Sequence, residues 1–111
     1  MNDLAAVRAE ILSAATEDLT GVYEAWWTAN TMHPDLALSA RLALAEESLR
    51  SLLSDGLVAL SRGSWESQVP VPEHEVEHVL REYKTWAVDD AADRIFFEAT
   101  AAGHAAYGLP G

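Results

Sequence analysis

His74 and His78 stand at the two ends of the run His-Glu-Val-Glu-His, which matches the H-E-x-x-H pattern of zinc peptidases. In those enzymes the two imidazoles hold the metal and the glutamate, here Glu75, acts on the bound water. On a helix with about 100° per residue, however, both histidines point away from the apolar stripe that includes Val76 and Tyr83. The pattern therefore indicates a solvated helix face. We expect at most adventitious binding of Zn²⁺ or Ni²⁺ by this pair, and a zinc peptidase is kept only as an alternative.

No other arrangement of reactive residues points to catalysis. The sequence has no cysteine, which excludes nucleophilic Cys chemistry, disulfides and Cys-ligated zinc. It also has no Ser-His-Asp order and no Gly-rich phosphate loop. We therefore expect a protein that is not an enzyme and that needs no cofactor.

The four tryptophans are the residues most able to anchor a partner. Trp26 and Trp27 point about 100° apart on a helix, so both are buried only if that helix is covered on two sides. Otherwise one of them marks an interface. Trp65 has the weakest claim to a core position and is the expected exposed anchor. Trp27 and Trp65 are therefore the candidate partner-binding residues.

Charge limits the class of partner. The chain of 111 residues has 18 acidic and 7 basic side chains, a formal net charge of −11, which repels polyanions such as nucleic acid and anionic membranes. The N-terminal run has neither a basic start nor an uninterrupted apolar stretch, so we expect no signal peptide and no membrane span. A cytoplasmic location is the simplest fit.

Three helices are expected in the first half of the chain. Apolar spacing of three and four predicts helices over residues 3–18, from Val22 to about residue 30, and from Ser39 or Ala40 to Asp55. Gly56 fits the left-handed position that ends a helix. Half of the residues are apolar, which suffices for one modest core, so we expect a single domain over residues 1–111.

The second half is expected to hold a small antiparallel ribbon. Residues 57–61 and 94–99 read as its two strands. An insertion of about residues 68–93 separates them: prolines end any strand there, and a helix is expected over residues 73–87. A last helix over residues 101–107 is capped by Thr100. The predicted fold class is mostly α with a small antiparallel β-ribbon.

This order of elements is similar to that of the winged helix-turn-helix superfamily. The run SLRSLLSDGLVALSRG, residues 48–63, resembles the passage from recognition helix to wing in MarR-like and PadR-like regulators. The run FFEATAAGHAAY, residues 96–107, is similar to the last wing strand and the helix that follows it. The turn at Pro34 and Asp35 fits the connection between the second and third helices. The likeness covers roughly residues 21–107 and implies a winged helix with a helical insertion in the wing.

The resemblance implies a small transcriptional regulator that binds double-stranded DNA, as a homodimer formed through the first and last helices. By analogy, the third helix would lie in the major groove, with Arg41 reading bases and Arg50 and Arg62 on phosphates. The implied nucleic-acid contacts are Ser39, Arg41, Ser48, Arg50, Ser51, Arg62 and Arg94.

The distribution of charge leaves a second interpretation open. Residues 1–36 carry a net charge of −5, residues 37–64 a net charge of zero, and residues 65–111 a net charge of −6. The segment expected to read DNA is thus net neutral in an acidic chain, which leaves much of the usual phosphate affinity missing. The alternative is an acidic winged-helix module that binds a basic protein partner or mimics DNA.

Overall fold

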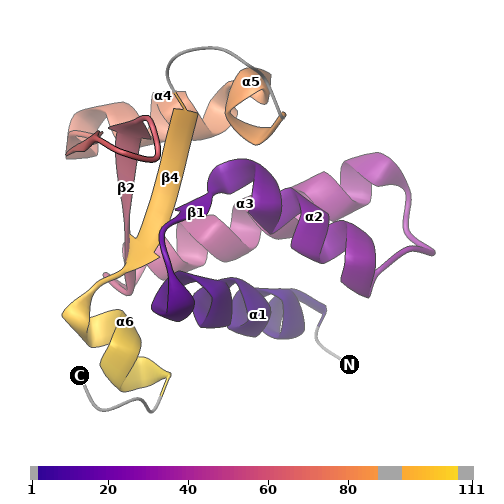
Figure 1. The fold of residues 1–111 in the computed structure, drawn as a ribbon. Coiled ribbons are helices and arrows are strands. Elements are labelled where there is room, and N and C mark those ends of the chain that lie inside the picture. Colours follow the sequence, from indigo (N-terminus) through magenta and orange to yellow (C-terminus); the bar gives the residue numbers. More distant parts are fainter. Residues whose placement is uncertain (1–2, 88–93, 108–111) are drawn as a thin grey trace.

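The computed structural model describes residues 3–87 and 94–107, and their helices and strands follow one another as Figure 1 shows. The elements are α1 (Asp3–Glu17), β1 (Thr20–Gly21), α2 (Val22–Met32), α3 (Leu38–Ser54), β2 (Val58–Gly63), β3 (Gln68–Pro70), α4 (Glu73–Arg81), α5 (Tyr83–Trp86), β4 (Arg94–Ala99) and α6 (Ala101–Ala106). Within this part of the chain the fold is mostly helical with a small antiparallel sheet, as predicted.

The sheet has four strands in the order β1-β4-β2-β3. The predicted ribbon is its centre: β2 and β4 pair in antiparallel register from Val58 opposite Ala99 to Gly63 opposite Arg94. Two edge strands were not expected. β1 has two residues, too few for an alternating pattern, and β3 ends on Pro70. The end of β3 at Pro70 agrees with the expectation that prolines end a strand in this segment, and the proline is accommodated because an edge strand tolerates a residue that cannot donate to the ladder.

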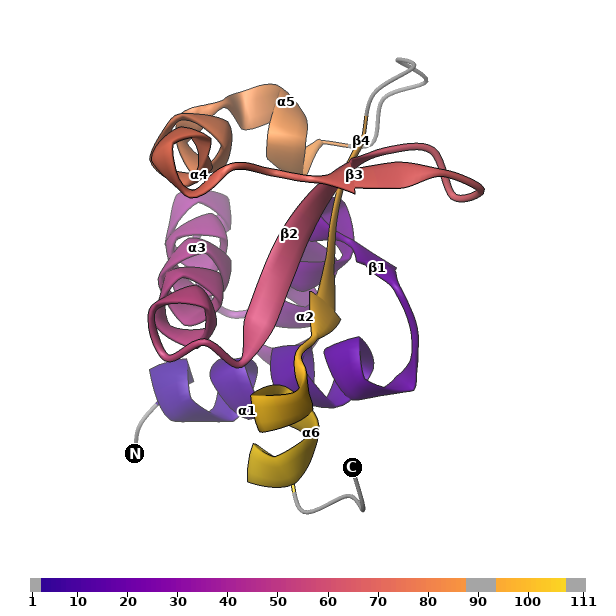
Figure 2. The ribbon, with the colours of Figure 1, turned by 90° about the vertical axis from the view of Figure 1, so that its left-hand side faces the viewer.

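The three long helices form the core with one face of the sheet. Val7 and Ile11 of α1, and Leu49 and Leu52 of α3, are completely buried. Phe97 of β4 joins the same apolar cluster. Figure 2 shows α1, α2 and α3 gathered behind β2 and β4, with β3 crossing in front. Burial of these apolar side chains is the main favourable term for a chain of this size.

The inserted segment folds as two helices, so the prediction of one continuous helix over residues 73–87 is wrong. The backbone is extended at Glu82, between α4 and α5. The side chains of Thr85 and Trp86 turn back to donate hydrogen bonds to the carbonyls of Val79 (2.7 Å) and Leu80 (2.9 Å) at the end of α4. This turn buries Trp86 but leaves Tyr83 65% exposed, although Tyr83 was expected in the apolar stripe of this segment.

The C-terminal end of α3 and the N-terminal cap of α6 agree with the sequence-based predictions. Gly56 has φ +72°, the left-handed conformation expected after α3. The Thr100 hydroxyl accepts a hydrogen bond from the Gly103 amide (3.1 Å) and so caps α6. The predicted loop over residues 88–93 and the predicted end at residues 108–111 lie outside the described residues. No helix among the described residues is long and apolar enough to span a membrane.

Candidate interaction groove

Two of the serines expected at a DNA surface are turned towards the protein. Ser48 is completely buried, so the expectation that its hydroxyl reaches a base or a phosphate is wrong. It occupies the same side of α3 as Leu52 and Ala45, which pack in the core. The hydroxyl of Ser51 accepts a hydrogen bond from Arg8 Nε of α1 (2.9 Å). Ser39, in the first turn of α3, is exposed.

Arg50 and Arg62, expected on phosphates, both face carboxylates of the inserted helix α4. Arg50 donates to Glu77 of α4 and to Glu46 of its own helix (3.0 Å). The nearest N–O distance between Arg62 and Glu75 is 3.7 Å. Burial lowers the pKa of Arg50, but its hydrogen bonds to Glu77 and Glu46 raise it overall above the ordinary value. Two carboxylates of α4, Glu77 and Glu75, thus lie beside the arginines that were expected to contact DNA phosphates.

The two remaining arginines of the DNA interpretation lie apart from each other. Arg41 is half-buried in α3, and its Nε has no hydrogen-bond partner among the described residues. Arg94, at the start of β4, places its guanidinium carbon 5.9 Å from the centre of the Tyr23 ring. Arg50 and Arg62 thus face the carboxylates of α4, and Arg94 lies beside Tyr23, while Arg41 forms no ion pair with the described residues.

His74 and His78 lie on the solvent-exposed face of α4, as their helical spacing predicted. The side chains of His74 and His78 are both exposed. His78 Nε2 lies 2.8 Å from Glu82 one turn later, and His74 lies 3.9 Å from Glu75. Among residues 3–87 and 94–107, no group of three or more His, Cys, Asp or Glu side chains could hold a metal ion. The solvated helix face is confirmed.

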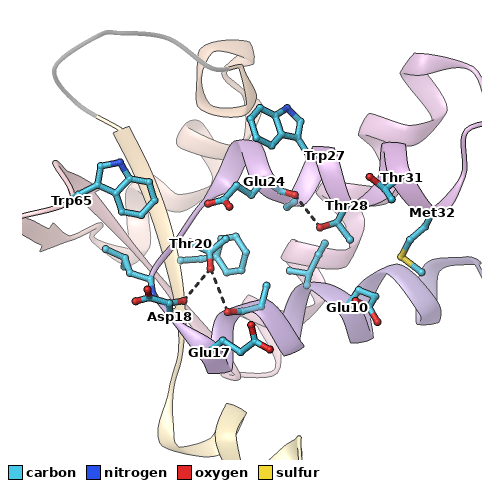
Figure 3. Close-up of a pocket in the computed structure, with 15 residues that line it drawn as sticks. Glu10, Glu17, Asp18, Thr20, Glu24, Trp27, Thr28, Thr31, Met32 and Trp65 are labelled. Atoms are coloured by element: carbon cyan, nitrogen blue, oxygen red, sulfur yellow. Dashed lines mark hydrogen bonds between the residues drawn. The ribbon is translucent and has the colours of Figure 1, made fainter.

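The described residues form a groove of about 610 Å³, drawn in Figure 3. The groove lies between α1, with the turn into β1, and α2, and Phe97 of β4 is among its lining residues. The turn between β2 and β3 closes one end with Trp65. Its volume lies within the range of about 300–1,000 Å³ that is usual for binding clefts.

Both tryptophans proposed as partner anchors line this groove. Trp65 is 48% exposed, which confirms its predicted exposure, and Trp27 is 51% exposed, so it is the residue of the adjacent pair that could mark an interface. Figure 3 shows the Trp65 indole at one end and the Trp27 indole on α2, with Glu24 between them. Trp26, by contrast, is covered by the inserted segment, since its ring packs edge-on against Tyr83 of α5 (6.0 Å between centroids). Helix α2 is therefore covered on one additional side only, and Trp27 is the tryptophan that stays exposed.

Trp65 is held in place by its turn and by the sheet. Its ring meets the Phe96 ring edge-on at 4.6 Å. Gln68 Nε2 donates to the Trp65 carbonyl (2.8 Å), which closes the turn. Gly63 precedes the turn with φ +146°, and a Cβ there would lie 2.3 Å from the Ser67 carbonyl oxygen. Only glycine allows the chain to turn this tightly, so the sequence fixes where Trp65 emerges.

Trp27 is positioned by a well-formed α2 N-terminus. The Glu24 carboxylate accepts a hydrogen bond from the Gly21 amide (2.9 Å), one of the donors that a helix start leaves free. The Tyr23 ring meets the Trp27 ring edge-on at 4.9 Å, one helical turn apart. The indole is therefore preorganised although half of it is in solvent.

Four carboxylates and no basic side chain line the groove: Glu10, Glu17, Asp18 and Glu24. Glu10 and Glu17 are exposed and form no ion pair with any described residue. Asp18 accepts a hydrogen bond from the Leu19 amide (2.7 Å). The hydroxyl of Thr20 already donates to the Asp18 carbonyl (3.0 Å), and that of Thr28 donates to the Glu24 carbonyl (3.0 Å). The groove therefore offers acceptors and aromatic surface to a ligand, with few free donors.

This combination suits a cation with an apolar stem. Carboxylates bind guanidinium and ammonium groups through charge-assisted hydrogen bonds, and an indole attracts the same groups through its face. The methylene stems of Lys and Arg can lie along the apolar surface of Met32 and the Trp27 ring.

The tryptophans of the groove were predicted, but its carboxylates were not. One signal was present in the sequence: Glu10 and Glu17 are seven residues apart, which places both on one face of the first helix. That face borders Ile11 and Ala14, which line the same groove. The contribution of Asp18 and Glu24 depends on the turn through β1 and had no comparable signal.

No protein-family model, no curated protein and no solved structure matches this chain. Function is therefore argued from the geometry of these residues.

Proposed function

We propose that this chain is a winged helix-turn-helix module that binds a basic segment of a protein partner in the groove between α1 and α2. The observation that carries the proposal is the groove itself: four carboxylates, no basic side chain, and two tryptophans, Trp27 and Trp65, each about half exposed. Half-exposed aromatic side chains beside unpaired charges are typical of interface anchors.

The order of strands supports the winged-helix assignment. A short strand between the first two helices, β1, pairs with β4, and β4 pairs with β2, which follows the third helix. Three helices followed by such a three-stranded sheet agree with the resemblance noted in the sequence. The further strand β3 and the helices α4 and α5 occupy the place of the wing and its insertion.

The arginine contacts favour a basic partner over DNA. A phosphate backbone would have to displace Glu77 from its hydrogen bond with Arg50, and it would approach Arg62 against the negative charge of Glu75, 3.7 Å away. The net charge of −11 opposes approach to DNA at every distance within the screening length. The same charge attracts a basic segment and speeds its association.

A small transcriptional regulator is the second candidate, and the strand order is the observation that favours it. In that case the chain is expected to act as a homodimer formed through α1 and α6. A cytoplasmic location suits both candidates.

The test uses two peptide probes of equal length, nona-arginine and nonaglutamine, titrated into the full chain while the intrinsic tryptophan fluorescence is recorded. We expect the arginine peptide to change the emission and to bind more weakly as salt rises, and the glutamine peptide to do neither. Duplex DNA at low ionic strength is the parallel probe. Binding of DNA with no binding of the arginine peptide would overturn the proposal in favour of the regulator.

The double variant Glu10→Gln with Glu17→Gln removes two groove charges without changing side-chain shape. We expect it to weaken nona-arginine binding about five- to tenfold, the effect of losing two partly screened charge pairs. Its matched control is Glu66→Gln with Glu73→Gln, which removes two exposed charges outside the groove. Equal loss in both double variants would show that net charge alone attracts the peptide, and the groove assignment would fall.

A further inference from the structure

A second hollow, of about 340 Å³, lies where the inserted segment meets the sheet. Its walls are α4, α5, the facing ends of β2 and β4, and Tyr23 at the start of α2. Its volume is near the lower end of the range for small-molecule sites. It shares none of its lining residues with the groove between α1 and α2.

The charge of this second hollow is opposite in sign to that of the groove. Three basic side chains, Arg62, Lys84 and Arg94, line it together with His78 and two carboxylates, Glu75 and Glu82. With His78 neutral the balance is one positive charge, in a chain whose net charge is −11. Such a local surplus in an acidic protein is where an anion would be held.

The two carboxylates of the hollow do not prevent its positive charge from meeting an anion. Glu82 is engaged on both sides, by His78 Nε2 at 2.8 Å and by Lys84 Nζ at 3.4 Å. The nearest oxygen of Glu75 is 3.7 Å from the Arg62 guanidinium, which is too far for a hydrogen bond. Glu75 therefore does not occupy the N–H donors of Arg62. Arg94 forms no ion pair with the described residues and rests over the Tyr23 ring, an interaction that leaves its N–H groups free to donate.

Arg62 of β2 and Arg94 of β4 both line the hollow. Arg62 pairs with Ile95, the residue after Arg94, so the two arginine side chains leave opposite faces of the ladder. Arg94 reaches the hollow at the end of β4 beside the Tyr23 ring, which also lines it. Two planar guanidinium groups match the oxygens of a carboxylate or a phosphate. Val79 and Ile95 supply an apolar wall beside them.

We propose that this hollow is a binding site for a small organic anion, a carboxylate or a phosphate monoester with an apolar body, held by Arg62 and Arg94. The apolar body lies against Val79 and Ile95, and the anionic group meets the two guanidiniums. The ligand would join the inserted segment to the sheet, because its contacts come from both.

The experiment titrates benzoate and phenyl phosphate, with benzyl alcohol as the uncharged probe, into ¹⁵N-labelled full-length protein. We expect both anions to shift the backbone amide signals of Arg62, Thr85 and Ile95 in a saturable way, and benzyl alcohol to leave them in place. Arg62→Gln and Arg94→Gln are each expected to weaken binding about tenfold, the size of a lost charge-assisted hydrogen bond. Arg81→Gln, an exposed arginine of α4 outside the hollow, is the matched control and should bind as the parent does.

The proposal is overturned if neither anion shifts these signals, if the shifts gather elsewhere, or if Arg81→Gln weakens binding as much as Arg62→Gln. Backbone amide spectra of each variant show whether it is folded, so a lost site is distinguished from a lost fold. Because the groove plays no part in this titration, its outcome is independent of the peptide experiment.

Discussion

Arg50 of α3 donates a hydrogen bond to Glu77 of α4, a residue 27 positions later in the chain. The contact ties the third helix to the inserted segment. Arg50 also bonds Glu46 one turn earlier, so a single guanidinium bridges two carboxylates. Its raised pKa keeps it charged over the ordinary pH range, and the bridge therefore depends on the ionisation of its acidic partners.

A double-mutant cycle of Arg50→Gln and Glu77→Gln should measure this tie. The groups are partly exposed, so we expect a coupling of about 0.5 kcal/mol in the free energy of unfolding. Urea unfolding at low and high salt is the measurement, and the coupling should shrink as salt rises.

The pair Glu77 and Arg81 gives a matched comparison for that cycle. Its N–O distance is 3.5 Å, the side chain of Arg81 is more exposed than that of Arg50 (74% against 27%), and the pair joins two residues of one helix. We expect a coupling of about 0.3 kcal/mol or less. A larger coupling here than for Arg50 and Glu77 would mean that α4 is not held to α3 by this contact.

Trp86 and Trp27 should differ in their contribution to the free energy of unfolding. Trp86 is 2% exposed and donates a hydrogen bond to the Leu80 carbonyl, so Trp86→Ala is expected to cost about 3–5 kcal/mol of unfolding free energy. Trp27→Ala removes a half-exposed ring and should cost about 1 kcal/mol or less. Urea unfolding of both variants checks this order. A variant Trp27→Ala as unstable as Trp86→Ala would place Trp27 in the core and remove it as an anchor.

The elements with a long apolar period or a dense β pattern were predicted closely from the sequence. Strand β4 has the predicted bounds, Arg94–Ala99, because its run of aromatic and β-branched residues is distinctive. Strand β1 could not be predicted, since two residues carry no period and its pairing with Phe96 and Phe97 is purely tertiary. The break at Glu82 was missed because apolar spacing runs through it unchanged.

The candidate site was predictable in its aromatic half. The geometry of adjacent helical residues predicted that one of Trp26 and Trp27 could be exposed, and the place of Trp65 beside Gly63 predicted the exposure of Trp65. That both line one groove depends on the β2–β3 turn packing against Phe96, a contact between parts of the chain far apart in sequence. Ser48 was predicted to be exposed because it is a serine with charged neighbours in a helix. Its burial depends on how α1 and α2 pack on α3, which the sequence does not show.

Gly103 should be intolerant of a side chain. A Cβ at this position would lie 2.0 Å from the Leu57 carbonyl oxygen, which is backbone and cannot move aside. We expect Gly103→Ala to cost about 1–3 kcal/mol, the usual range for overpacking. Ala102→Ser, at an exposed position of the same helix, is the control and should change stability by about 0.5 kcal/mol or less. Equal urea midpoints for the two variants would show that α6 does not pack closely on the start of β2.

The double variant Glu75→Gln with Glu77→Gln decides whether α4 merely hides a DNA-binding surface. It releases Arg62 and Arg50 from their partners in α4 and changes the formal net charge from −11 to −9. Affinity for duplex DNA depends on neutralised phosphates, and two freed arginines on so acidic a chain fall well short of the six to ten contacts of a typical binder. We therefore expect no shift of a random duplex in a gel at about 50 mM salt, for the parent or the variant. A salt-sensitive shift gained by the variant, and lost again on adding Arg50→Gln, would show that the inserted helix controls access to a DNA surface and would restore the regulator as the leading interpretation.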